Sequence, residues 1–321
     1  MRLARMLLST GLVGLGLFVA HEAGAAPRLY VSNEFADTVT VIDLQTEKPV
    51  AVIPVGKRPR GIKASPDRRT VYVAVGEDDA IAAIDVKSNT VLEKIPAGSD
   101  PEVFDLSPDG RFIYVSNEET HTASLIDVAN KKVMGTVKVG VEPEGVAVSP
   151  DGKWVYVSSE TSHTISVIDA PTFKVVHTIL VGVRPRGIAF SPDGTRAYVA
   201  AEVGGVVSVI DTKTQKVIDT ITILREDEKP MGVAVLPDGD KVYVTTGRGN
   251  TVAVIDAKTY QVLQYIPVGK RAWGIAITPD GKRAFTANGV SANVSVIDTA
   301  ADKVVSTLPA GKGAWGIAIV W

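Results

Sequence analysis

The dipeptide Ile-Asp recurs at nearly constant intervals at seven places in this chain of 321 residues. Successive aspartates are 42 residues apart, except for one interval of 45 residues. An aromatic residue precedes each of them by 13 positions, and a Pro-Asp pair falls between successive copies. Self-similarity at a period of about 40 residues is the signature of a repeat architecture. The chain must therefore build one fold from seven equivalent units. The aspartates are Asp43, Asp85, Asp127, Asp169, Asp211, Asp256 and Asp298.

Each unit contains four short segments that are rich in β-branched and aromatic residues, such as GVAVSP, WVYVSS, TISVIDA and KVVHTILV. Such segments favour strands. SPDG is typical of the tight turn of a hairpin, and the side chains of the Ile-Asp turn can bond to their own backbone. These aspartates and the Pro-Asp turns are therefore interpreted as scaffold. Four antiparallel strands in about 40 residues match one propeller blade. The sequence predicts an all-β, seven-bladed β-propeller.

The repeat is interrupted at both ends of the predicted domain. It begins with RLYVSN, which is the second strand of a unit, and its last strand is GIAIV, which is a first strand. We expect GIAIV to pair beside Leu29–Ser32, so that the C-terminal strand completes the N-terminal blade. This pairing closes the ring and removes the free edge that an open array would present.

Residues 1–25 differ from the repeats. Arg2 and Arg5 precede an apolar stretch that ends in the small residues around Ala23 and Ala25. This is the layout of a cleaved secretory signal, so residues 26–321 form the predicted mature domain, located in the periplasm. No further segment is long and apolar enough to span a membrane. The net charge of -2 gives no attraction to nucleic acid, and the absence of cysteine excludes thiol chemistry.

The links that precede the first strands are the place where the units differ. The first strand of a blade lines the central channel, so we expect these links to surround one channel mouth. The residue predicted to stand just before each strand is, in order, Arg60, Glu102, Glu144, Arg186, Met231, Trp273 and Trp315. Two positions earlier stand Arg58, Asp100, Glu142, Arg184, Lys229, Arg271 and Gly313.

Around this ring an apolar arc faces a charged arc. Two interpretations remain open. The charged residues form ordinary ion pairs between blades while the tryptophans cover the channel, or the tryptophans and arginines bind a planar anion or a loop of a partner. The candidate binding residues are Arg58, Arg60, Glu102, Glu144, Arg184, Arg186, Met231, Arg271, Trp273 and Trp315.

Candidates for other chemistry are few. His121 and His163 share a loop register with Asp37 and Asp79, and are weak candidates for a metal site. The sequence has no nucleophile elbow, HExxH motif or phosphate loop. No catalytic residue is predicted, and we expect a protein that is not an enzyme.

The runs LYVSNEFADTVTVID, IYVSNEETHTASLID and VYVSSETSHTISVID resemble the YVTN-type β-propeller repeat. With the export signal and seven units, the chain is most similar to the bacterial β-propeller proteins associated with PQQ-dependent catabolism. The resemblance implies a monomeric, non-catalytic accessory of quinoprotein alcohol oxidation. It implies no resident cofactor, although contact with PQQ is an option. Implied partners are a periplasmic quinoprotein dehydrogenase, a cytochrome or a transport component. The alternatives are a lactonase-like hydrolase, using carboxylates or a metal at the mouth, and a surface adhesion module.

Overall fold

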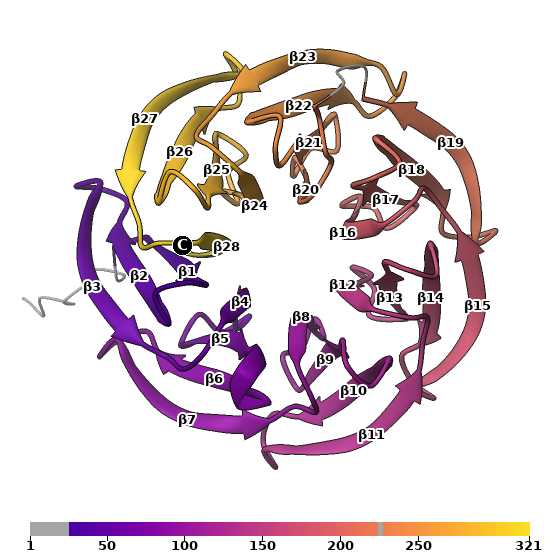
Figure 1. The fold of residues 1–321 in the computed structure, drawn as a ribbon, viewed down its shortest axis with the longest axis horizontal. Coiled ribbons are helices and arrows are strands. Elements are labelled where there is room, and N and C mark those ends of the chain that lie inside the picture. Colours follow the sequence, from indigo (N-terminus) through magenta and orange to yellow (C-terminus); the bar gives the residue numbers. More distant parts are fainter. Residues whose placement is uncertain (1–25, 224–226) are drawn as a thin grey trace, which may run out of the picture.

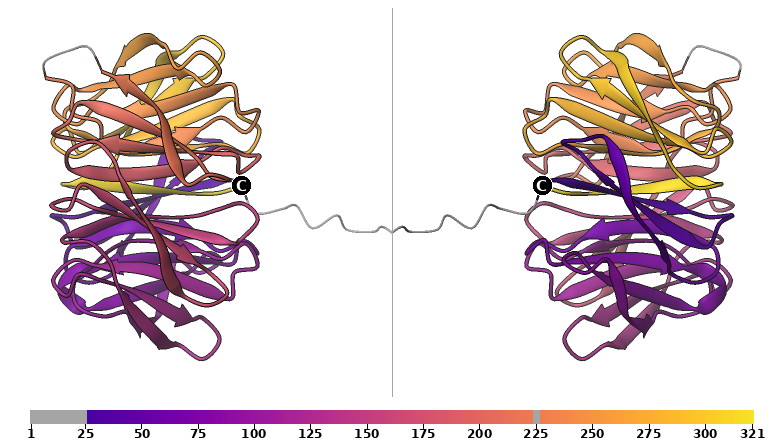
Figure 2. Two further views of the ribbon diagram at one scale, coloured as in Figure 1. Left: turned by 90° about the vertical axis from the view of Figure 1, so that its right-hand side faces the viewer. Right: turned by 90° about the vertical axis from the view of Figure 1, so that its left-hand side faces the viewer.

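The computed structural model describes residues 26–223 and 227–321. They form seven four-stranded antiparallel sheets, arranged radially around a central axis (Figure 1). In side view the molecule is a disc whose loops project from its two flat faces (Figure 2). The predicted seven-bladed β-propeller is confirmed. The predicted signal, residues 1–25, lies outside the described residues.

We number the blades in chain order, so that blade 1 contains β28 and β1–β3 and blade 7 contains β24–β27. The innermost strands are β28 (Ala314–Val320), β4 (Pro59–Ala64), β8 (Pro101–Leu106), β12 (Pro143–Val148), β16 (Pro185–Phe190), β20 (Val233–Val235) and β24 (Ala272–Ile277). The second strands are β1 (Arg28–Asn33), β5 (Thr70–Val75), β9 (Phe112–Asn117), β13 (Trp154–Ser159), β17 (Arg196–Ala201), β21 (Lys241–Thr245) and β25 (Arg283–Asn288).

The third strands are β2 (Thr38–Asp43), β6 (Ala80–Asp85), β10 (Thr122–Asp127), β14 (Thr164–Asp169), β18 (Val206–Asp211), β22 (Thr251–Asp256) and β26 (Asn293–Asp298). The outer strands are β3 (Lys48–Pro54), β7 (Thr90–Pro96), β11 (Lys132–Lys138), β15 (Lys174–Leu180), β19 (Lys216–Thr222), β23 (Val262–Pro267) and β27 (Lys303–Pro309). A short 3-10 helix, η1 (Gly76–Asp78), follows β5.

The ring is closed as expected. Strand β28 pairs antiparallel with β1, with Leu29 opposite Ile319 and Tyr30 opposite Ala318. Blade 1 is therefore assembled from the two ends of the domain, and β1 has a partner on both sides (Figure 1).

The repeated aspartates stabilise turns. The Asp151 carboxylate accepts hydrogen bonds from the Ser149 hydroxyl at 2.7 Å and the Lys153 amide at 3.1 Å, and these bonds lower the pKa of Asp151 to about 2. In the Ile-Asp turn, Asp169 accepts from the amide of Thr172 at 2.9 Å and from its hydroxyl at 2.6 Å. Both sets of turns serve as scaffold, as predicted.

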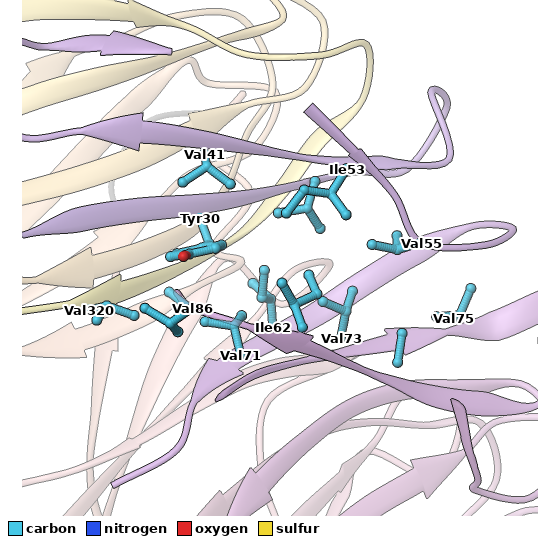
Figure 3. Packing of buried hydrophobic residues seen from close by; sticks show 14 residues of the cluster. Tyr30, Val41, Ile53, Val55, Ile62, Val71, Val73, Val75, Val86 and Val320 are labelled. Carbon is cyan, nitrogen blue, oxygen red and sulfur yellow. The ribbon is translucent and has the colours of Figure 1, made fainter. Parts of the chain in front are cut away.

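The core lies between the blades. Tyr30 and Val41 of blade 1 pack with Val71 and Val73 of blade 2, and all four side chains are buried (Figure 3). The other apolar clusters likewise join neighbouring blades. A single blade therefore cannot bury its own apolar faces.

No helix within residues 26–223 and 227–321 has the length and hydrophobicity needed to cross a membrane.

Candidate functional site

The predicted ring at the channel mouth exists, but most of its residues do not precede the innermost strands. Arg60, Glu102, Glu144, Arg186, Trp273 and Trp315 are each the second residue of such a strand. Only Met231 precedes its strand, β20. The ladder to the second strand shifts register between the first and fourth residues, for example between Pro185 and Ile188. This bulge leaves the second residue free of the ladder and places it at the mouth.

Hydroxyl groups of the second strands hold these residues in place. Ser158 donates to the carbonyl of Arg186 in the next blade at 2.6 Å, and Ser116 donates in the same way to Glu144. The Thr245 hydroxyl donates to the carbonyl of Trp273 at 2.5 Å. Each bond fixes a mouth residue from the preceding blade. Comparison of the repeats does not single out these hydroxyl residues, because serine and threonine are common on strands.

Replacement of Ser158 by alanine removes one such bond and leaves the Arg186 carbonyl with less support. We expect the free energy of unfolding to fall by about 1 kcal/mol. Alanine is sterically acceptable, because Ala74 and Ala200 occupy the same register in blades 2 and 5. Chemical denaturation of S158A checks this. The matched control is Ser306→Ala, because the Ser306 hydroxyl has no hydrogen-bond partner within the described residues; equal losses in both variants would contradict the prediction.

The charged arc consists of two buried ion-pair groups. In the first, Arg60 contacts Glu102 of the next blade and lies 2.8 Å from Glu34 of the preceding one. Arg58 contacts Asp100 and lies 3.0 Å from the Glu102 carboxylate, which is fully buried. Arg58 and Arg60 are therefore both paired with the carboxylate of Glu102.

The second group is centred on Arg186. Its guanidinium lies 2.7 Å from both Glu144 and Glu160 and 2.8 Å from Glu202. Arg184 lies 2.6 Å from Glu160 and 3.4 Å from Glu202. The first of the two interpretations, ion pairs between blades, is thus what the structure shows for the charged arc.

These groups contain more carboxylates than guanidinium groups. Burial raises the pKa of Glu102, and burial together with the nearby carboxylate of Glu102 raises the pKa of Glu144. Burial, reinforced by the Glu144 carboxylate, also raises the pKa of Glu160. Burial opposes the charge on Arg60, but the carboxylates around it raise its pKa overall, so it stays cationic.

The raised pKa values predict a pH dependence of stability. A carboxyl group whose pKa is higher in the folded state binds its proton more tightly there, so its contribution is present at low pH and lost as pH rises through the folded value. The turn aspartates, whose pKa values are lowered, lose their contribution only in more acidic solution. We therefore expect the free energy of unfolding to be higher at pH 5 than at pH 8, as measured by urea denaturation.

In the Glu144→Gln variant, which removes one of the groups responsible, we expect a flatter profile between pH 5 and pH 8. A wild-type profile that is flat or that rises with pH would refute the assignment of these three carboxyl groups.

The tryptophans form the opposite arc. The rings of Trp273 and Trp315 stack with centroids 6.0 Å apart and an angle of 24° between their planes. The loop beside Trp273 carries Gly289, where an added Cβ atom would lie 2.9 Å from the indole. Blades 1 and 5 carry Glu34 and Glu202 at this loop position. Glycine thus makes room for the indole where other blades place a carboxylate, a pattern that comparison of the loops could have revealed.

Several cations of this arc have no carboxylate partner in the described part of the chain. One of them is Arg271, whose guanidinium lies 4.6 Å from the centroid of the Trp273 ring. The guanidinium of Arg186, which is paired with carboxylates of the charged arc, lies 5.7 Å from the same centroid. Burial, with the nearby charges of Arg248 and Arg186, lowers the pKa of Arg271. Arg248, Lys270 and Lys312 likewise form no ion pair there. Positive charge is neutralised on the charged arc and left in excess around the tryptophans.

A cavity of about 160 Å³ lies in the channel at this mouth. Glu144, Arg186, Met231, Trp273 and Trp315 line it, together with the backbone of the inner strands. Met231 is buried, so it forms part of the wall and not of the outer surface. Five of the ten candidate residues therefore share one cavity.

A second cavity of about 500 Å³ opens toward the other face of the disc and is lined mainly by alanine and aliphatic side chains. The two cavities have Ile188, Val233, Ile275, Ile317 and Lys63 in common. The channel below the mouth is therefore mainly apolar, and its one shared charged side chain, Lys63, lies 3.2 Å from the Asp105 carboxylate.

The histidines occupy structural positions. His121 and His163 have positive φ angles of 55° and 57°, as do Asp37 and Asp79 at the same register. Their Nδ1 atoms lie 3.0 Å and 2.7 Å from carbonyls of their own loops. Histidine and aspartate are among the residues that tolerate this conformation, which explains the shared register.

The carboxylates of Asp100, Glu102 and Glu118 lie close enough together to hold a cation. Arg58 already contacts two of the three, and neither histidine belongs to this group. In the connection around residues 224–230, Glu228 is buried and accepts hydrogen bonds from Thr251. Glu228 is therefore packed against the protein, whereas the neighbouring Asp227 is exposed.

Two family profiles match the chain. Residues 29–149 match the YNCE-like beta-propeller family, and residues 175–307 match a family described as lactonase, 7-bladed beta-propeller. Both are β-propeller families, so the prediction of a β-propeller family is confirmed. The link to PQQ-dependent catabolism stays a prediction. No curated protein has a significant match to the chain.

Solved structures with this fold include hydrazine synthase of Kuenenia stuttgartiensis, with a TM-score of 0.75 and 24% identity over 81% of this chain and 89% of that one. A functionally unknown protein of Desulfotomaculum acetoxidans DSM 771 has a TM-score of 0.80 and 20% identity over 91% of this chain and 98% of that one. At such identities the likeness shows the fold alone, and a propeller carries many functions.

Proposed function

We propose that this protein is a non-catalytic binding protein of the periplasm that holds a partner at the tryptophan side of its channel mouth. The observation that carries the proposal is the uneven pairing of charge. The arginines of the charged arc are neutralised by buried carboxylates, whereas Arg271, Lys270 and Lys312 have no ion pair within residues 26–223 and 227–321. A protein surface with unpaired cations beside aromatic rings favours an acidic partner.

The outer edge of the same arc is apolar. Phe35 is 73% exposed and Val290 is 69% exposed, and they lie in the loops beside Trp315 and Trp273. The amide of Phe35 bonds to the carbonyl of Lys312, and that of Val290 to the carbonyl of Lys270. Each apolar side chain thus adjoins a lysine that forms no ion pair in the described part of the chain. Aromatic side chains and arginines are enriched in the regions that contribute most to the energy of protein interfaces.

The resemblance to proteins associated with PQQ-dependent catabolism supplies the setting. In this proposal the protein is an accessory of quinoprotein alcohol oxidation, and the partner is the dehydrogenase, its cytochrome or a transport component. The test is binding of the mature protein to each of the three, measured at low and high salt. We expect one of them to bind, with an affinity that falls as salt increases.

The charge-reversed variant Lys270→Glu/Lys312→Glu should lose at least tenfold in affinity. The control is Lys87→Glu/Lys213→Glu, which changes two exposed lysines in turns between third and outer strands, on the opposite face. Absence of binding by all three partners, or equal binding by both variants, would overturn the proposal.

A second candidate is a lactonase-like hydrolase, which the family profile over residues 175–307 favours. The buried carboxyl group of Glu144 lines the cavity and its pKa is raised by burial, as suits a general acid. Turnover of a lactone that is lost in Glu144→Gln, but retained in Glu119→Gln on the outer loop, would establish this candidate in place of the accessory function.

A further inference from the structure

We infer that the cavity at the mouth binds a small carboxylate with a single ring, of the size of benzoate, with its carboxylate outward and its ring in the channel. This inference rests on the proposed binding role of the mouth, and it names the class of ligand that the mouth takes.

The size of the cavity sets the first limit. Its volume is about 160 Å³. An apolar cavity of about 150 Å³ accommodates one benzene ring. The walls formed by Trp273 and Trp315 are flat, and Met231 and Ile275 supply adaptable apolar surface. A planar ring is the shape that stacks best on an indole. A three-ring compound such as PQQ exceeds the space.

The charges decide the sign of the ligand. Glu144 lies on the wall opposite the tryptophans, but its negative charge is engaged by Arg186 at 2.7 Å. The Arg271 guanidinium lies over Trp273 without a carboxylate partner in the described residues. Arg248 adds a second positive charge close to it. A partly buried, unpaired guanidinium gains more from an anion than from a neutral ligand.

A donor without an acceptor completes the site. The Nε1–H group of Trp315 is buried and has no hydrogen-bond partner among residues 26–223 and 227–321, although the indole lines the cavity. Buried donors are nearly always satisfied in folded proteins, and a ligand oxygen at the mouth would satisfy this one. The carboxylate therefore lies near Arg271 and Trp315. The ring points toward the apolar side chains of Ile275 and Ile317. Lys63, which also lines this part of the channel, is paired with Asp105 at 3.2 Å.

The experiment is a titration of the mature protein with benzoate and, separately, with its neutral analogue benzyl alcohol. Binding is measured by calorimetry and by tryptophan fluorescence. We expect one benzoate per chain, at least tenfold tighter than benzyl alcohol, and weaker at high salt. Arg271→Gln should weaken benzoate binding at least tenfold. Its control is Arg111→Gln, which removes an arginine that lies 5.3 Å from the Phe112 ring in a hairpin on the other face. Thermal melts establish that both variants fold.

Three results would overturn the inference: no benzoate binding, equal affinity for benzyl alcohol, or an unchanged affinity in Arg271→Gln. Displacement of benzoate by an equimolar amount of PQQ would overturn the limit to a single ring. The three partner proteins are assayed in the same preparations. Partner binding without benzoate binding refutes this inference alone, and benzoate binding without partner binding refutes only the proposed function.

Discussion

Deletion of residues 315–321 is expected to abolish the cooperative thermal transition and to cause aggregation. The deletion removes most of β28, so the ladder of β1 loses one of its two partners. It also uncovers two core clusters, because Ala318 and Val320 belong to one and Ile317 to the other. Loss of a large buried aliphatic side chain costs about 2–5 kcal/mol. Loss of two, together with the ladder, reaches the total of about 5–15 kcal/mol that stabilises a typical domain.

Trp315→Ala is the control, because Trp315 lies in the bulge between the paired residues Ala314 and Ile317. We expect this variant to melt cooperatively, with the affinity for ligand reduced. Calorimetry and size-exclusion chromatography measure both proteins. A truncated protein that melts in one sharp transition as a monomer would show that closure of the ring is dispensable.

Replacement of Arg186 by methionine is expected to lower the free energy of unfolding by about 3–5 kcal/mol, and the melting temperature by about 10 °C. Arg186 contacts Glu144, Glu160 and Glu202, and the variant leaves these carboxylates with Arg184 as their remaining cation. An uncompensated buried charge costs more than the lost attraction. The loss should shrink at pH 5, where part of the carboxyl groups take up protons.

Arg271→Met tests whether this cost comes from ion pairing. Arg271 occupies the same mouth and stacks on the same indole, but it has no carboxylate partner in the described residues. We expect its replacement to cost about 1 kcal/mol or less. Urea denaturation of both variants at pH 8 gives the comparison. Equal losses would mean that contact with Trp273, and not neutralisation of the carboxylates, explains the effect of Arg186.

Internal repetition made the fold predictable. Because seven copies could be aligned within one chain, each turn and strand was identified several times, and the incomplete units at the two ends had one consistent solution. The same alignment located the candidate ring, since scaffold positions such as Asp151 and Asp169 recur and mouth positions do not.

The pairing of the ring could not be predicted in the same way. The partners of Arg186 include Glu160 and Glu202, which come from a different loop register. Which cation lacks an ion pair depends on the distances between side chains of neighbouring blades, and these distances cannot be read from the sequence. The shift of the mouth residues onto the strands depends on a backbone bulge. A glycine follows the mouth residue in six of the seven blades, but glycine fits a loop before the strand as well as a bulge, so it does not identify the bulge. The closeness of Arg248 to Arg271 likewise emerges only from the structure, whereas the glycine at position 289 stands out when the loops are compared.

The register of β28 on β1 also determines how the closed ring resists force. Arg28 lies opposite Val320, so the first residue of β1 and the last residue of β28 lie side by side. A pull applied between these two residues loads the backbone hydrogen bonds one after another, as in opening a zipper. A pull applied between Asn33 and Val320 loads them together in shear. The propeller is therefore mechanically anisotropic: weak when its two ends are drawn apart, and strong when the same strands are made to slide.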